Sequence, residues 1–78
     1  MLTEEQIAEG WAEAVTLDAM IGRPIIYRNV DALPVVQLEA WLDGIDEGWA
    51  VVEFLDGGRA TVRPSRIIAY RKELPDAR

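Results

Sequence analysis

The stretch "VVEFLDGGRATVRP", residues 51 to 64, decides the fold. Two runs of alternating apolar and polar residues flank Asp56, Gly57 and Gly58. Alternation is typical of half-buried strands, and glycine adopts the positive φ angles that a tight hairpin turn requires. Pro64 ends the second run, because proline cannot donate a hydrogen bond to a neighbouring strand. The stretch therefore predicts a β-hairpin.

The same alternation recurs through the rest of the chain after residue 22. We expect five strands, at residues 24 to 29, 35 to 42, 49 to 55, 59 to 63 and 67 to 71. A tight turn at residues 64 to 66 joins the last two, and residues 43 to 48 read as a solvated loop. One face of the three middle strands is apolar and predicts the core: Val36, Leu38, Ala40, Leu42, Ala50, Val52, Phe54, Ala60 and Val62.

The start of the chain predicts a helix. Thr3 and Gln6 have the spacing of a capping box. Ile7, Trp11 and Val15 follow at helical spacing, so we expect a helix that docks on the strands through these three side chains. Gly10 lies inside this pattern, either as a tolerated residue or as a point of close backbone packing.

The helix should break near Thr16, which can cap a second short helical turn that Gly22 and Pro24 end. We divide the chain into a helical segment at residues 1 to 22, a β-barrel at residues 23 to 71 and a flexible tail at residues 72 to 78. All three belong to one domain, since 78 residues leave room for one small core.

The order of the expected strands resembles an SH3-like barrel, and "VVEFLDGGRATVRPSRIIAY" is similar to the Tudor and KOW class. The resemblance covers about residues 23 to 71. It implies an α+β, mainly β fold: a five-stranded SH3-like barrel preceded by an N-terminal helix and a short helical turn. Such folds host unrelated functions, so the resemblance bears on function by analogy alone.

Two activities known from this fold class can be compared with the residues present. A Tudor-like aromatic cage would need several rings to converge, and the alternative is aromatic packing in the core or at its rim. Plasmid-borne dihydrofolate reductases of the SH3-like type carry a Val-Gln-Ile-Tyr strand, whereas this chain reads Thr-Val-Arg-Pro at residues 61 to 64, so that activity is not carried over. The candidate cage residues are Tyr27, Trp41, Trp49 and Tyr70.

Composition narrows the chemistry. The chain has no cysteine and no histidine, which excludes disulfides, thiolate or imidazole metal ligands and any triad with an imidazole base. The hydroxyl groups have no base to activate them, so we expect no enzyme activity, no metal and no cofactor. No apolar run reaches the ~20 residues of a membrane span, and the start lacks the features of a signal peptide. We expect a cytoplasmic protein without a membrane partner.

Apolar residues are in excess for so short a chain. Alanine, valine, isoleucine, leucine, methionine, phenylalanine and tryptophan together number 37 of 78. The excess fills the core, or part of it forms an interface for a partner or a second copy. We expect a homodimer, with Trp41 or Trp49 on the non-core strand face as the contact.

Charge is distributed unevenly along the chain. Residues 1 to 56 carry twelve acids and two arginines, a net −10, and residues 57 to 78 carry a net +4. Arg59, Arg63 and Arg66 follow one another around the hairpin and form a candidate strip for phosphates or an acidic protein. The alternative is that they pair with Glu39, Glu53 or the acidic residues of the helix inside the molecule.

These features favour a small non-catalytic module that binds a protein partner through Arg59, Arg63, Arg66, Trp41 and Trp49. Seven arginines against one lysine indicate a GC-rich genome, bacterial or phage, and a phage or mobile-element accessory protein that modulates a host protein fits the size and composition. The alternative is a Tudor- or KOW-like module that binds nucleic acid through the arginine strip, although the net charge of −6 opposes a polyanion.

Overall fold

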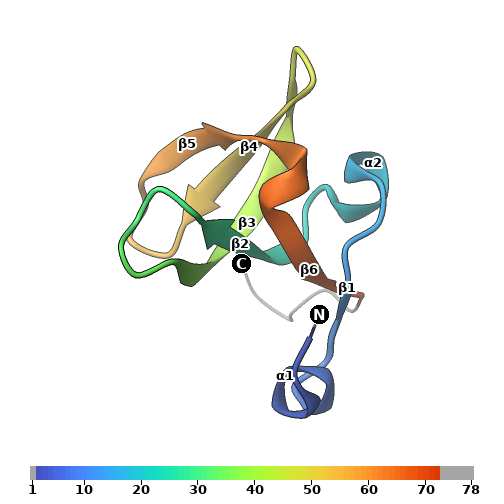
Figure 1. The fold of residues 1–78 in the computed structure, drawn as a ribbon. Helices are drawn as coiled ribbons and strands as arrows, with labels where there is room; N and C mark the ends of the chain where they lie inside the picture. Colours follow the sequence, from blue (N-terminus) through green and yellow to red (C-terminus); the bar gives the residue numbers. More distant parts are fainter. Residues whose placement is uncertain (1, 73–78) are drawn as a thin grey trace.

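The computed structural model describes residues 2 to 72, and Figure 1 shows the path of the chain. The predicted tail, residues 72 to 78, lies outside the described residues except for Lys72. The elements in chain order are α1 (Glu4–Ala8), β1 (Trp11–Glu13), α2 (Leu17–Met20), β2 (Pro24–Asn29), β3 (Val36–Asp46), β4 (Trp49–Phe54), β5 (Arg59–Val62), the 3-10 turn η1 (Pro64–Arg66) and β6 (Ile67–Arg71).

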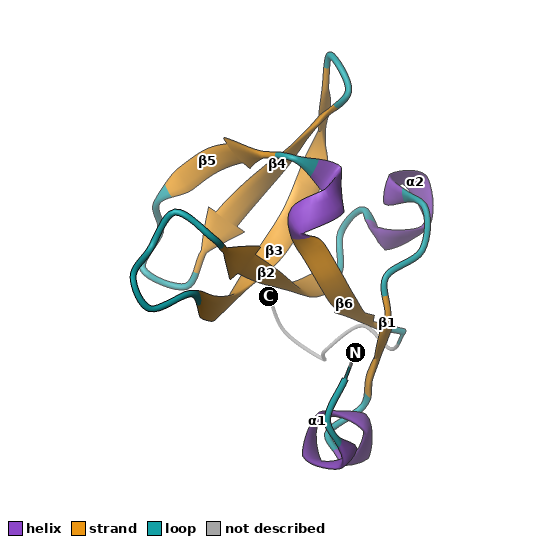
Figure 2. Ribbon diagram, in the orientation of Figure 1, coloured by secondary structure: helices purple, strands orange, loops and turns teal. Residues whose placement is uncertain are grey.

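The chain is α+β and mainly β, as the sequence predicts. Six antiparallel strands form one sheet in the order β1-β6-β2-β3-β4-β5. The sheet curls around its main core, a second, smaller cluster of buried residues contains Trp11, Ile26 and Ala69, and the short helices lie at the margins of the sheet (Figure 2). The prediction of a five-stranded barrel was wrong in strand number and in closure. Among residues 2 to 72, β1 is a sixth strand, and β1 and β5 are the two edges of the sheet.

The core lies on the predicted face of the middle strands, but it is shorter than predicted. Ala40, Leu42, Ala50, Val52 and Val62 are buried, as expected, together with Met20, Ile25 and Ile67. Val36 and Leu38 are exposed. The pairing of β3 with β4 begins only at Ala40 opposite Phe54, so the first residues of β3 extend beyond the strand that would cover them.

The predicted N-terminal helix is much shorter than its apolar pattern. The capping box is confirmed: the Gln6 N–H donates to the Thr3 hydroxyl at 3.1 Å, and the Thr3 N–H donates to the Gln6 side-chain oxygen at 3.0 Å. The helix ends at Ala8, and Gly10 has a φ of 97°, in the left-handed region that favours glycine. Gly10 therefore ends the helix, which neither interpretation of it anticipated.

The docking of this segment was also predicted wrongly. Trp11 is buried, but as the first residue of β1, which pairs with β6 and brings Trp11 against Ile26 and Ala69. Ile7 and Val15, the other two side chains of the expected stripe, are exposed. Pairing with the edge of β6 satisfies backbone hydrogen-bonding groups that a docked helix would leave open to water.

The hairpin and the turn after it agree with the sequence. Asp56 accepts a hydrogen bond from the Gly58 N–H at 2.8 Å, and Gly57 has a φ of 92°. The Phe54 N–H donates to the Gly58 carbonyl at 2.7 Å and closes the hairpin. The predicted loop at residues 43 to 48 is reduced to a turn at Glu47 and Gly48, because β3 continues through a bulge near residue 43 and reaches Asp46.

Candidate binding site

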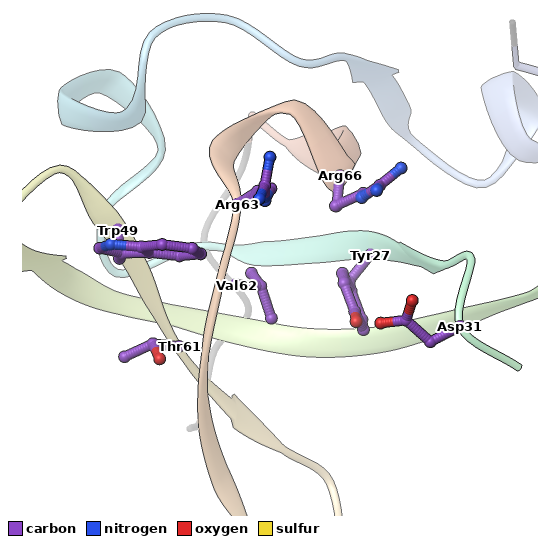
Figure 3. A pocket seen from close by; sticks show the side chains of 7 residues that line it. All are labelled: Tyr27, Asp31, Trp49, Thr61, Val62, Arg63 and Arg66. Atoms are coloured by element: carbon purple, nitrogen blue, oxygen red, sulfur yellow. The ribbon is translucent and has the colours of Figure 1, made fainter.

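A pocket of about 390 Å³ lies where β5, the edge strand, faces β2 and the loop that follows it. We call it the seam pocket. β5 crosses the view in Figure 3, with Trp49 and Thr61 on one side of the strand and Val62, Tyr27 and Asp31 on the other. The residues that line it are Tyr27, Asp31, Trp49, Thr61, Val62, Arg63 and Arg66.

Trp49 and Arg63 lie close together across the hairpin because of the order in which its hydrogen-bonded and non-hydrogen-bonded pairs alternate. Phe54 and Gly58 form a hydrogen-bonded pair, and in an antiparallel ladder every second pair is hydrogen-bonded. Ala50 and Val62 are therefore also a hydrogen-bonded pair. Trp49 and Arg63 lie one position further along, in a non-hydrogen-bonded position, where opposed side chains are closest. The Arg63 guanidinium carbon lies 5.8 Å from the centre of the Trp49 ring.

Arg66 joins this pair through the 3-10 turn. Its N–H donates to the Arg63 carbonyl at 2.9 Å, so the turn brings the second arginine back toward the first. Both line the seam pocket, and in the view of Figure 3 both lie along its upper side. Within residues 2 to 72, neither Arg63 nor Arg66 forms a salt bridge. The two guanidinium groups are therefore available to an external anion.

Arg59 does not belong to this site. Its guanidinium forms a salt bridge with Glu53 at 3.3 Å, and its Nε lies 3.9 Å from an oxygen of Asp43. Arg59 and Glu53 are opposite each other in the ladder, also in a non-hydrogen-bonded pair. The alternative interpretation, pairing inside the molecule, holds for Arg59, and the predicted strip of three arginines is reduced to two.

Trp41 lies elsewhere on the sheet. It is half-buried and lines a separate hollow with Pro24, Leu55 and Arg71. Of the five predicted site residues, the structure brings together Trp49, Arg63 and Arg66, and it places Arg59 and Trp41 apart from them. The four candidate cage rings do not converge either, since Trp49 and Tyr27 line the seam pocket while Tyr70 packs against the core.

Tyr27 and Asp31 were not predicted from the sequence to lie beside the arginines, although all four residues line the seam pocket. Tyr27 tilts against Phe54, with ring centres 6.2 Å apart, and its position is set by the pairing of β2 with β3 and β6. The Asp31 N–H donates to the Asn29 side-chain oxygen at 3.1 Å. The sequence "NVD" at residues 29 to 31 signals this turn, but nothing in the sequence places it beside β5.

A second hollow, of about 560 Å³, lies on the other side of the Trp49 and Arg63 pair. Glu47, Gly48, Trp49, Arg63, Pro64 and Ser65 line it. The pair is therefore a ridge between two depressions. Trp49 is 44% exposed, an unusual amount for the largest apolar side chain in a domain with a small core. The exposed ring and the guanidinium beside it are both accessible to a ligand.

No helix among residues 2 to 72 is long and apolar enough to cross a bilayer. In the same range, no three acidic side chains lie close enough together to hold a metal ion. Comparison of the chain with protein-family models, curated proteins and solved structures found no match.

Proposed function

We propose that the protein is a small non-catalytic module that binds an acidic region of a protein partner through Trp49, Arg63 and Arg66. One observation carries the proposal. The Arg63 guanidinium lies over a 44% exposed tryptophan ring, 5.8 Å from its centre, beside a second arginine, and within residues 2 to 72 neither arginine has a salt bridge.

The chemistry of these groups favours a carboxylate ligand. The positive charge of a guanidinium is attracted to the face of an aromatic ring, and its planar fork binds a carboxylate through two parallel hydrogen bonds. Contact with the ring also restricts the side chain in advance, so less conformational entropy is lost on binding. Tryptophan and arginine are the residues most enriched at the energetic centres of protein interfaces.

Nucleic acid is the second candidate, and the charges favour it less. Arg59 is neutralised by Glu53, which leaves two arginines at the site, and Asp31 lines the same pocket. Affinity for a polyanion depends on many phosphate contacts made together. A net charge of −6 on the whole chain opposes them.

A capture experiment with matched variants tests the proposal. Arg28 is exposed and lines a different hollow, with Val35, Gln37 and Ile68, so Arg28→Glu is the control for Arg63→Glu. We expect Arg63→Glu to lose a captured protein that the parent and Arg28→Glu retain, in nuclease-treated lysate. Capture that nuclease treatment abolishes would favour the nucleic-acid alternative, and equal loss in both variants would contradict the site.

A further inference from the structure

The strand beside the seam pocket has an open backbone edge. In the part of the chain that the structure describes, β5 pairs with β4 alone. We infer that the partner binds as an extended segment that adds to the edge of β5 as a new strand and places one acidic side chain at Arg63 and Arg66. This inference rests on the proposed function and specifies the form of its ligand.

The alternation of hydrogen-bonded and non-hydrogen-bonded pairs in the hairpin determines which backbone N–H and carbonyl groups of β5 do not bond to β4. Ala60 and Val62 are in hydrogen-bonded pairs with β4, opposite Val52 and Ala50. Thr61 lies between them, so its N–H and carbonyl point away from β4 and toward the seam. Thr61 is also exposed. A donor and an acceptor that face outward from one residue are what an added strand pairs with.

The pocket has room on both sides of this edge. Trp49 and Thr61 lie on one side of β5, and Val62 with Tyr27 lies on the other (Figure 3). Successive side chains of an added strand point alternately to the two faces of a sheet. Such a strand would therefore place every second side chain against the apolar surface of Tyr27 and Val62, and the others on the face of Thr61 and Trp49.

The charges of the pocket limit the ligand further. In Figure 3 Arg63 lies on the side of Trp49, and Arg66 lies on the side of Tyr27 and Asp31. A carboxylate is attracted by the arginines and repelled by Asp31, so its favoured place is beside Arg63, on the side of Trp49. The ligand that fits best is thus an extended segment with an acidic side chain at that place and apolar or small polar side chains toward Asp31.

The other edge of the sheet does not offer these features. β1 is three residues long and ends at an exposed glutamate, Glu13. The arginine nearest it, Arg71, already lies over the buried ring of Trp11, at 4.6 Å. The open edge of β5 is therefore the better template for a strand with an acidic side chain.

The test uses a defined probe and two substitutions at one position. The probe is an acetylated, amidated peptide of sequence Thr-Val-Glu-Val-Thr, and its twin has lysine in place of glutamate. Thr61→Pro removes the outward N–H and leaves the bonds to β4 intact, since proline is tolerated where the N–H faces away from the sheet. Thr61→Ala removes the side chain and keeps the N–H.

We expect the peptide to shift the amide signals of β5 in a nuclear magnetic resonance titration and to slow hydrogen exchange at the Thr61 N–H. Losing the hydrogen bond in Thr61→Pro should weaken binding by roughly tenfold, and Thr61→Ala should change it by less than about threefold. The lysine twin should bind about tenfold more weakly than the glutamate peptide. Hydrogen exchange on the unaltered chain keeps the test valid if Thr61→Pro fails to fold.

Different failures have different meanings. If Arg63→Glu abolishes peptide binding while Thr61→Pro binds as tightly as Thr61→Ala, strand addition is overturned and the proposed function stands. If the glutamate and lysine peptides bind alike and Arg63→Glu has no effect, the proposed function fails as well. Thr61 protection that grows with protein concentration in the absence of peptide would assign the edge to a second copy and overturn the inference. The absence of any shift in the amide signals of β5 at several millimolar peptide would also overturn the inference.

Discussion

Arg63 lies over Trp49 at the open end of the hairpin, 5.8 Å from the centre of its ring, while Arg71 lies over Trp11 at the opposite edge of the sheet, 4.6 Å from the centre of its ring. Both arginine–tryptophan pairs join neighbouring strands. They differ in burial, because Trp11 is 3% exposed and Trp49 is 44% exposed. The first pair belongs to the packing of the fold, and the second presents a surface.

This difference in burial predicts a large loss of stability for one tryptophan substitution and a small loss for the other. Trp11→Ala should lower the free energy of unfolding by about 3–5 kcal/mol, because it empties a buried position between Ile26 and Ala69. Trp49→Ala should lower it by about 1 kcal/mol or less, since the ring is largely on the surface. Urea unfolding measures both. Equal losses would mean that Trp49 is part of the core and not of a binding surface.

Gly10 and Gly44 provide a test of how the N-terminal segment is built. An added Cβ meets nothing within 4 Å at either position, but Gly10 has a φ of 97° and Gly44 lies outside that left-handed region. Gly10→Ala should therefore destabilise the protein by about 1–2 kcal/mol through backbone strain, and Gly44→Ala should change stability by less than about 1 kcal/mol. Thermal unfolding distinguishes them, and a neutral Gly10→Ala would place the end of α1 elsewhere.

Arg59 should behave as a weak internal ion-pair partner. Its side chain is 70% exposed, so its salt bridge with Glu53 is screened by water, and Arg59→Gln should cost no more than about 1 kcal/mol. Partner capture should be retained in this variant. Loss of capture in Arg59→Gln, with the melting temperature unchanged, would restore the three-arginine strip.

Self-association is expected from the apolar side chains that the fold leaves uncovered. Leu33, Val36 and Leu38 are exposed at the start of β3 and in the loop before it. We expect a homodimer at tens of micromolar in sedimentation equilibrium, and a monomer for Val36→Glu combined with Leu38→Glu. A parent protein that sediments as a monomer would leave this apolar surface to a different partner.

Local signals in the sequence predicted the hairpin well and the N-terminal segment poorly. Asp56, Gly57 and Gly58 fix a turn through their own backbone preferences, so the hairpin follows from adjacent residues. Ile7, Trp11 and Val15 have helical spacing, but Trp11 is a strand residue, because β6 offers it an edge that lies far away in sequence. Local hydrophobic periodicity does not indicate pairing with a strand that is distant in sequence.

In the candidate site too, contacts between residues close in sequence were predictable, and contacts between distant elements were not. Trp49 and Arg63 oppose each other across a short hairpin, so the sequence brings them together. Arg66 follows through one tight turn. Tyr27 and Asp31 come from β2 and the loop after it, and their place in the seam pocket depends on how far the sheet curls. The register that brings Trp49 to Arg63 also places Glu53 opposite Arg59, so the internal pairing that removes Arg59 from the site follows from the same hairpin.

The central claim is that Arg63 beside Trp49 holds an acidic protein ligand, and affinity measured with matched charge reversals tests it most directly. The measurement is the dissociation constant of the purified captured partner for the parent, Arg63→Glu and Arg28→Glu, each at two salt concentrations. We predict at least about tenfold weaker binding for Arg63→Glu and less than about threefold for Arg28→Glu, with a shallow salt dependence. Equal weakening by the two variants, or none by Arg63→Glu, would contradict the account.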